Sequence, residues 1–193
     1  YEFLWNEFCD WYIEAAKVRL RSTPDEQAVV SQTLAFVIDR TLKLLHPFMP
    51  YVTEELFQEF GKPIGRQGLL ISQRWPALDE KLIDAAADAE VNWVIRLITA
   101  IRSTRSDLNV PAGAKVPFAL VGASAETEQR LKTYQSLIER LARLESVSVA
   151  KEAPKGAIRI VLDEATACLD VAALIDLKAE IARLEKEIAR HRG

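Results

Sequence analysis

The sequence predicts a mainly α-helical fold, in which a helical bundle is followed by a small α+β module and a terminal heptad helix. In the first half of the chain, apolar residues recur at helical three- and four-residue spacing between clear start and stop signals. Beyond about residue 110 the pattern changes to short strands around a helix. The last leucines and isoleucines are spaced as a coiled-coil seam. We therefore expect three parts, at 1–110, 111–171 and 172–193.

The first stretch, YEFLWNEFCDWYIEAAKVRL, is predicted to be a helix with more than one buried face. It carries six aromatic residues within its first twelve positions. On a helical wheel its polar residues fall on one arc, and the remaining apolar arc is much wider than the ~100° stripe of a surface helix. This width indicates either two neighbouring helices or one neighbour and a flat ligand such as a nucleobase.

Three more helices complete the predicted bundle. A capping box at Thr23 and Glu26 starts the second helix, which Pro47 ends. The third is expected at 50–61, where a proline opens it and a glycine closes it. After a loop rich in glycine and proline, the fourth is expected at about 80–106. These start and stop residues define the bundle more firmly than helix propensity does.

The α+β module follows from a change in period. VPFALVG at 116–122 is typical of a short strand, and the amphipathic run at 124–144 predicts a helix. VSVA at 147–150 and AIRIVLD at 157–163 are expected to be strands joined through a turn at PKG. ATACLDV at 165–171 is a candidate for one more strand. Strands around one helix are consistent with a small α+β module.

Composition and motifs argue against a catalytic or metal-binding role. Cys9 and Cys168 have no partner at metal-ligand spacing, so no metal site is expected. His46 is interpreted as bonding carbonyls at a helix end, and no nucleophile with a positioned base is found. No residue is therefore expected to be catalytic. No apolar run is long enough to cross a bilayer, and the cysteine usage fits the cytoplasm.

The net charge of −3 gives no global attraction to a polyanion, but two basic clusters are present. Lys17 and Arg19 lie near the end of the first helix, and Arg102 and Arg105 share a face of the fourth. On charge alone, solvated faces with cations at helix C-termini are the simpler interpretation. The aromatic density of the first helix favours the alternative, because exposed rings and phosphate contacts hold single-stranded RNA.

Several long blocks resemble a known family. WNEFCDWYIEAAKVRL, TLKLLHPFMPYVTEELFQ and LLISQRWP resemble the anticodon-binding domain of class I aminoacyl-tRNA synthetases. Within that group, VNWVIRLITAIRSTRSDLNVPAGAKVPFALV, LIERLARLESVSVA and ALIDLKAEIARLEKEIAR are similar to the valyl-tRNA synthetase family, the last of them to the start of its coiled-coil arm. The resemblance covers essentially the whole chain.

The resemblance implies a part of a valine–tRNA ligase that selects tRNA. The ATP-site signatures HIGH and KMSKS are missing, so catalysis, editing and the use of ATP with Mg are expected upstream, and no cofactor is expected in this chain. A sequence that begins on tyrosine is also interpreted as a piece of a longer one. The implied partner is valine tRNA, with no membrane, bound by a monomer. The residues expected to contact tRNA are Trp5, Asn6, Phe8, Lys17, Arg19, Arg102 and Arg105.

Two alternatives stay open. The chain can belong to a sibling enzyme, such as an isoleucyl- or methionyl-tRNA synthetase. It can also be a helical protein–protein scaffold that dimerises through the heptads at 172–193. Within the first helix, Trp11 and Tyr12 are expected to be bundle core, whereas Phe8 is expected to be the stacking platform for a base.

Overall fold

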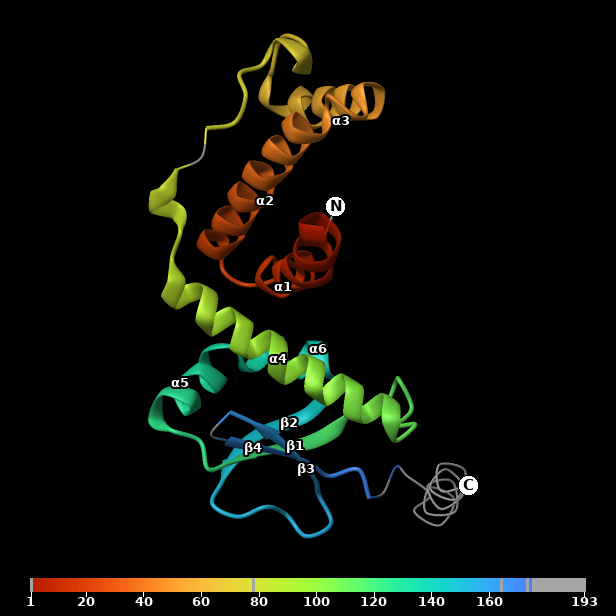
Figure 1. Ribbon diagram of the computed structural model, residues 1–193, viewed down its shortest axis with the longest axis vertical. Helices are drawn as coiled ribbons and strands as arrows, with labels where there is room; N and C mark the ends of the chain where they lie inside the picture. The colour runs from red at the N-terminus through yellow and green to blue at the C-terminus, as the bar shows by residue number, and fades with distance from the viewer. Residues whose placement is uncertain (1, 78, 164, 173, 175–193) are drawn as a thin grey trace, which may run out of the picture. The chain divides into compact units, whose positions relative to one another are not determined.

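The computed structural model describes residues 2–77, 79–163, 165–172 and 174 of the chain (Figure 1). The predicted heptad helix lies outside these residues from position 175 onward. The chain divides into two compact units, unit 1 at Tyr1–Asp84 and unit 2 at Ala85–Gly193. The fourth predicted helix groups with the α+β module in this division, and the predicted boundary near residue 110 stays a prediction.

Unit 1 is helical, as the sequence predicts, and short 3-10 turns occupy the segment after its last long helix. Its first element differs from the prediction, since it is a π-helix whose closing bond runs from the Ile13 N–H to the Phe8 carbonyl. Residues 70–72, within the loop expected after the third helix, form one of the 3-10 turns. The elements are η1 (Phe3–Tyr12), α1 (Ile13–Arg19), α2 (Pro24–Leu45), α3 (Pro50–Gly61), η2 (Lys62–Ile64), η3 (Leu70–Ser72) and η4 (Glu80–Leu82).

The end of α2, the middle of α3 and the turn η3 share one apolar cluster. Leu42, Phe57 and Leu70 are each at most 5% exposed, and Ile38 packs against them. Leu70 comes from the segment after α3, so its burial anchors that segment to both helices. Removal of these side chains from water is the main apolar contribution to this end of unit 1.

Unit 2 consists of a four-stranded sheet with helices on it. The strand order is β2-β1-β4-β3. β1 pairs in parallel with β2 and antiparallel with β4, and β3 and β4 form an antiparallel hairpin. All four expected strands are present. The elements are α4 (Ala85–Asp107), β1 (Val116–Val121), α5 (Ala125–Thr133), α6 (Gln135–Ala142), β2 (Leu144–Ala150), β3 (Ile158–Leu162) and β4 (Ala165–Leu169).

The single helix expected at 124–144 is two helices. Tyr134 leaves the helical region with φ −105° and ψ 12°, which separates α5 from α6. Arg143 ends α6 in the left-handed region at φ 53°, where a non-glycine residue is uncommon. β2 then starts at the next residue, so this turn sets the direction in which the chain enters the sheet.

Helix α4 packs against α6 and β3 within unit 2 (Figure 1). Its buried residues recur at helical spacing, so they form one stripe along one side of the helix. None of the helices in the part of the chain described here is long and apolar enough to cross a membrane. The buried stripe of α4 consists of Trp93, Val94, Leu97, Ile98, Ile101 and Arg105.

The side-chain caps of α2 and α5 give a first prediction. Ser124 Oγ accepts a hydrogen bond from the Thr127 N–H at 3.1 Å, whereas Thr23 Oγ1 accepts from the Glu26 N–H at 3.4 Å. Ser124→Ala should lower the stability of unit 2 by about 1 kcal/mol, because a helix N–H loses its partner. Thr23→Ala should cost unit 1 less, because its bond is longer. Urea denaturation followed by circular dichroism tests the order, and a larger loss for Thr23→Ala contradicts it.

Candidate nucleic-acid interface

The seven residues predicted to contact RNA belong to two different units, five to unit 1 and two to unit 2. No group of metal-ligating side chains is found among the described residues. The set in unit 1 is Trp5, Asn6, Phe8, Lys17 and Arg19; the set in unit 2 is Arg102 and Arg105.

On the π-helix η1, only part of the predicted aromatic surface is exposed. Trp5 is 58% exposed and Asn6 is also exposed. Phe8 is only 6% exposed and stacks on Tyr12 with a ring-centroid distance of 5.7 Å. This burial argues against Phe8 as the platform for a base and gives it a packing role. Trp11 and Tyr12 are half-buried, in line with the packing expected for them.

The basic residues of α1 are at the surface. Lys17 and Arg19 lie in the last turn of the helix, where the helix dipole favours cations. Lys17 is ion-paired with Glu14 on the same helix, whereas Arg19 has no ion pair with any carboxylate of the described chain. Arg19 can therefore contact phosphate without breaking an ion pair within the described residues, whereas Lys17 would exchange its exposed pair with Glu14.

Arg105 has an internal role. Its side chain is buried, with the residue 7% exposed. Nη1 donates to the carbonyls of Arg143 at 2.9 Å and Ala142 at 3.4 Å. Nη2 donates to those of Ala114 at 2.7 Å and Pro111 at 3.3 Å. The guanidinium thus ties the end of α4 to the end of α6 and to the loop before β1, which argues against the predicted RNA contact.

Arg102 acts at the same place from a more exposed position. Its Nε–H donates to the Leu141 carbonyl at 2.9 Å. Together with Arg105 it supplies donors to carbonyls at the C-terminal end of α6, which have no partner within their own helix. Burial lowers the pKa of the Arg105 guanidinium, and the nearby Arg143 cation lowers it further. The two arginines are therefore primarily structural in unit 2.

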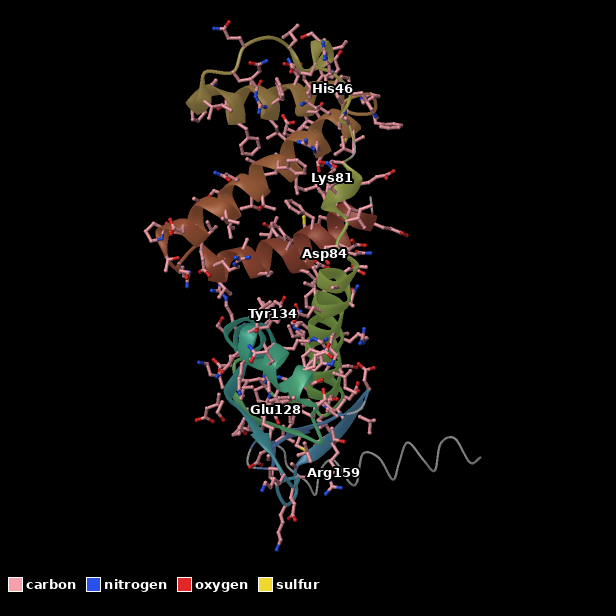
Figure 2. All side chains as sticks on the ribbon, turned by 90° about the vertical axis from the view of Figure 1, so that its left-hand side faces the viewer. His46, Lys81, Asp84, Glu128, Tyr134 and Arg159 are labelled. Atoms are coloured by element: carbon pink, nitrogen blue, oxygen red, sulfur yellow. The ribbon has the colours of Figure 1, made fainter. Side chains whose placement is uncertain are left out.

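A feature that the sequence analysis missed is a hollow on unit 1, here called the α2–loop groove. It has a volume of about 420 Å³ and lies between the end of α2, the start of α3 and the segment after α3. His46, at the α2 end, is labelled in Figure 2. The side chains that line it include Lys43, His46, Leu70, Gln73, Arg74 and Trp75.

A second hollow of about 510 Å³ adjoins the groove and shares Lys43 and Gln73 with it. Asp39 is one of the residues that line it. The Asp39 carboxylate is 2.7 Å from Lys43 Nζ, 3.3 Å from the Arg66 guanidinium and 3.9 Å from that of Arg40. One carboxylate therefore faces three cations, which leaves this side of α2 positively charged.

The segment that carries Trp75 is fixed to α3 by hydrogen bonds. The Leu70 N–H donates to Glu54 Oε2 at 2.8 Å. Gln58 Nε2 donates to the Gly68 carbonyl at 2.9 Å and to Glu54 Oε1 at 2.7 Å. The groove wall is therefore built by specific bonds, and its residues hold a defined place before any ligand arrives.

His46 is held differently from the prediction. Its Nδ1 lies 2.8 Å from Thr53 Oγ1, and that hydroxyl donates its hydrogen to the Met49 carbonyl at 2.7 Å. Because a hydroxyl has one hydrogen, Nδ1–H must be the donor in the first bond. The imidazole therefore bonds a buried threonine of α3 instead of helix-end carbonyls, which fixes the ring at the groove.

Sequence reasoning missed the groove because its residues come from separate segments. The LKLLH end of α2 and the SQRW segment lie about thirty positions apart. A basic residue next to tryptophan, Arg74 and Trp75, in a segment without regular structure was the available signal, since such pairs occur where nucleic acid is bound.

The chain is similar to known proteins over nearly its whole length. The family described as "Anticodon-binding domain of tRNA ligase" matches residues 1–120. A protein named valine–tRNA ligase from Mesorhizobium japonicum is 47% identical over 98% of the chain and 20% of its own length. Another with that name from Caulobacter vibrioides is 46% identical over 100% of the chain and 22% of its own length. The chain thus spans about one fifth of these relatives.

Proposed function

Because the chain belongs to the family of anticodon-binding domains of tRNA ligases, we propose that it is the tRNA-binding C-terminal part of a valine–tRNA ligase. The observation that carries the proposal is the likeness of nearly the whole chain to proteins of that name. Their shared name also favours the valyl enzyme over the isoleucyl and methionyl siblings. The bundle would receive the anticodon region of valine tRNA.

The exposed residues of the N-terminal helices supply the contacts. Trp5 and Asn6 would approach unstacked bases, because aromatic faces hold such bases and amides bond their edges. Lys17 and Arg19 would bind phosphate. Phe8 supports this surface from beneath through its stacking on Tyr12. In unit 2, Arg102 and Arg105 maintain the structure, so they are not needed as RNA contacts in this proposal.

The rest of the reaction belongs to the parts of such a ligase outside this chain. ATP, used with Mg²⁺, valine activation and editing are assigned there, and no residue described here is given a role in them. We place the protein in the cytoplasm as a monomer, in keeping with tRNA as its partner. The scaffold alternative has no observation in its favour among the described residues, and a dimer lost on deletion of 172–193 would revive it.

Binding of tRNA by the chain tests the proposal directly. We expect valine tRNA to bind at least about tenfold more tightly than the same tRNA with a swapped anticodon, since one misread base costs roughly 1.4 kcal/mol or more. Affinity should fall with salt, because phosphate contacts release counterions. Fluorescence anisotropy measures both. Isoleucine and methionine tRNAs serve as matched controls, and equal affinity for all four RNAs would remove the claim of anticodon recognition.

A further inference from the structure

We propose that the α2–loop groove of unit 1 is a second RNA site, which binds one unstacked nucleotide with its base on Trp75 and its phosphate at Arg74 and Lys43. The inference rests on the proposed function, since tRNA is the source of the nucleotide. It adds a contact separate from Trp5 and Lys17, and nothing in the family description assigns it.

The ring of Trp75 is available to a base. The residue is 63% exposed although it is the largest apolar side chain type, and it lines a groove of about 420 Å³. Hollows of a few hundred Å³ are the size that holds small organic groups. Leu70 is buried, its N–H is bonded to Glu54, and its carbonyl accepts from the Gln73 N–H at 2.9 Å, so the chain is anchored shortly before Trp75. This anchoring reduces the freedom that the segment loses when a base stacks on the ring.

The charge around the groove suits a phosphate. Arg74 is exposed and has no ion pair with any carboxylate in the described part of the chain. Lys43 shares the Asp39 carboxylate with Arg66 and Arg40, so the group of four carries an excess of positive charge. A phosphate would offset that excess, and an arginine is well suited to bind it in a bidentate way.

Polar groups in the groove are in position to bond a base or a ribose. His46 keeps its ring orientation through the 2.8 Å bond from Nδ1 to Thr53. Gln73 lines both the groove and the adjoining hollow. An amide can bond the edge of a stacked base, which single-stranded RNA presents freely.

A protein segment is the competing occupant, because Ile71, which lines the groove, is apolar and 75% exposed. The uncompensated cations favour the nucleotide, since a segment of protein that buried Arg74 or Lys43 would have to supply carboxylates at the same spacing. Burial of the groove by a protein segment, here called protein cover, is therefore one of the outcomes that the test distinguishes.

The test compares five variants of the full chain, at four positions, with hexauridylate and valine tRNA as the probes. Arg74→Ala and Trp75→Ala remove the two groups that the proposal uses. Arg159→Ala, on an exposed position of β3, is the matched charge control, and Tyr51→Ala removes a 91% exposed ring outside the groove. Circular dichroism of each variant verifies folding, which the exposure of all four side chains should preserve.

We expect Trp75→Ala to weaken hexauridylate binding about fivefold or more, and Trp75→Phe to restore most of it, because a phenyl face still stacks. Arg74→Ala should weaken it similarly and lower the salt slope, d log K/d log[salt], by about 0.7. The controls should stay within about twofold. Valine tRNA should respond in the same order.

The outcomes separate the two proposals. If the groove variants bind both probes like the unchanged chain, the groove assignment is wrong, while a retained anticodon preference leaves the proposed function standing. If they weaken hexauridylate binding but valine tRNA shows no anticodon preference, the groove stands and the anticodon proposal falls. Unchanged RNA binding together with loss of a protein contact in the intact ligase would identify protein cover instead, and would overturn the RNA site.

Discussion

Arg105→Ala is expected to destabilise unit 2 by about 3 kcal/mol or more, although arginine is usually a surface residue. The side chain donates to four carbonyls, of Ala142, Arg143, Pro111 and Ala114. Truncation removes all four bonds. The Arg143 and Pro111 carbonyls keep backbone donors, the Val116 N–H at 3.3 Å and the Ala114 N–H at 3.0 Å, so the cost falls mainly on the Ala142 and Ala114 carbonyls, at about 1–3 kcal/mol for each group that water cannot reach. Arg105→Lys should recover only part of the loss, because an ammonium cannot reproduce the planar fork.

Arg96→Ala on the same helix is the matched control for this prediction. Arg96 is also an α4 arginine, but its side chain is 52% exposed and it pairs with a half-exposed Asp163 at 2.8 Å. Such surface pairs contribute only about 0–1 kcal/mol. Hydrogen exchange at β1 and β4 reports on unit 2 separately from unit 1. Unchanged protection in Arg105→Ala, together with lost tRNA affinity, would restore the RNA role predicted from the sequence.

The buried stripe of α4 shows why the burial of Arg105 was not predicted. Arg105 follows Ile98 and Ile101 at the spacing of one helical face, so its position on the buried side could be read from the sequence. Residue type suggested the opposite, because arginine is rarely buried without a partner. Two of its partners are carbonyls at the α6–β2 turn, almost forty positions later, and the other two lie in the loop before β1. No local sequence pattern indicates these bonds.

Helices and strands with explicit end signals were predicted well. The proline and glycine at its ends gave α3 its observed bounds, Pro50–Gly61, and the strands on both sides of the PKG turn are present. The break at Tyr134 was missed because the apolar spacing continues across it. The α2–loop groove was missed for a related reason, since its walls meet only through tertiary packing.

Leu70→Ala is expected to destabilise unit 1 by about 2–4 kcal/mol, the second large effect. Leu70 is 3% exposed and packs with Leu42 and Phe57, where α2, α3 and the turn η3 meet. Loss of the side chain leaves a cavity between two helices that cannot close without moving both, so the cost includes a cavity term. Urea denaturation, with hydrogen exchange at α2 and α3 to assign the transition, measures it.

Ile71→Ala supplies a control one position away, because Ile71 is 75% exposed and should cost less than about 0.5 kcal/mol. Stability is also connected with RNA binding. Leu70 anchors the segment that carries Trp75, so Leu70→Ala should also weaken hexauridylate binding under conditions in which the chain remains folded, with the exposed Arg159→Ala variant as the control. Equal stability losses for the two substitutions would show that Leu70 does not anchor the segment, and preorganisation of the groove would then lose its support.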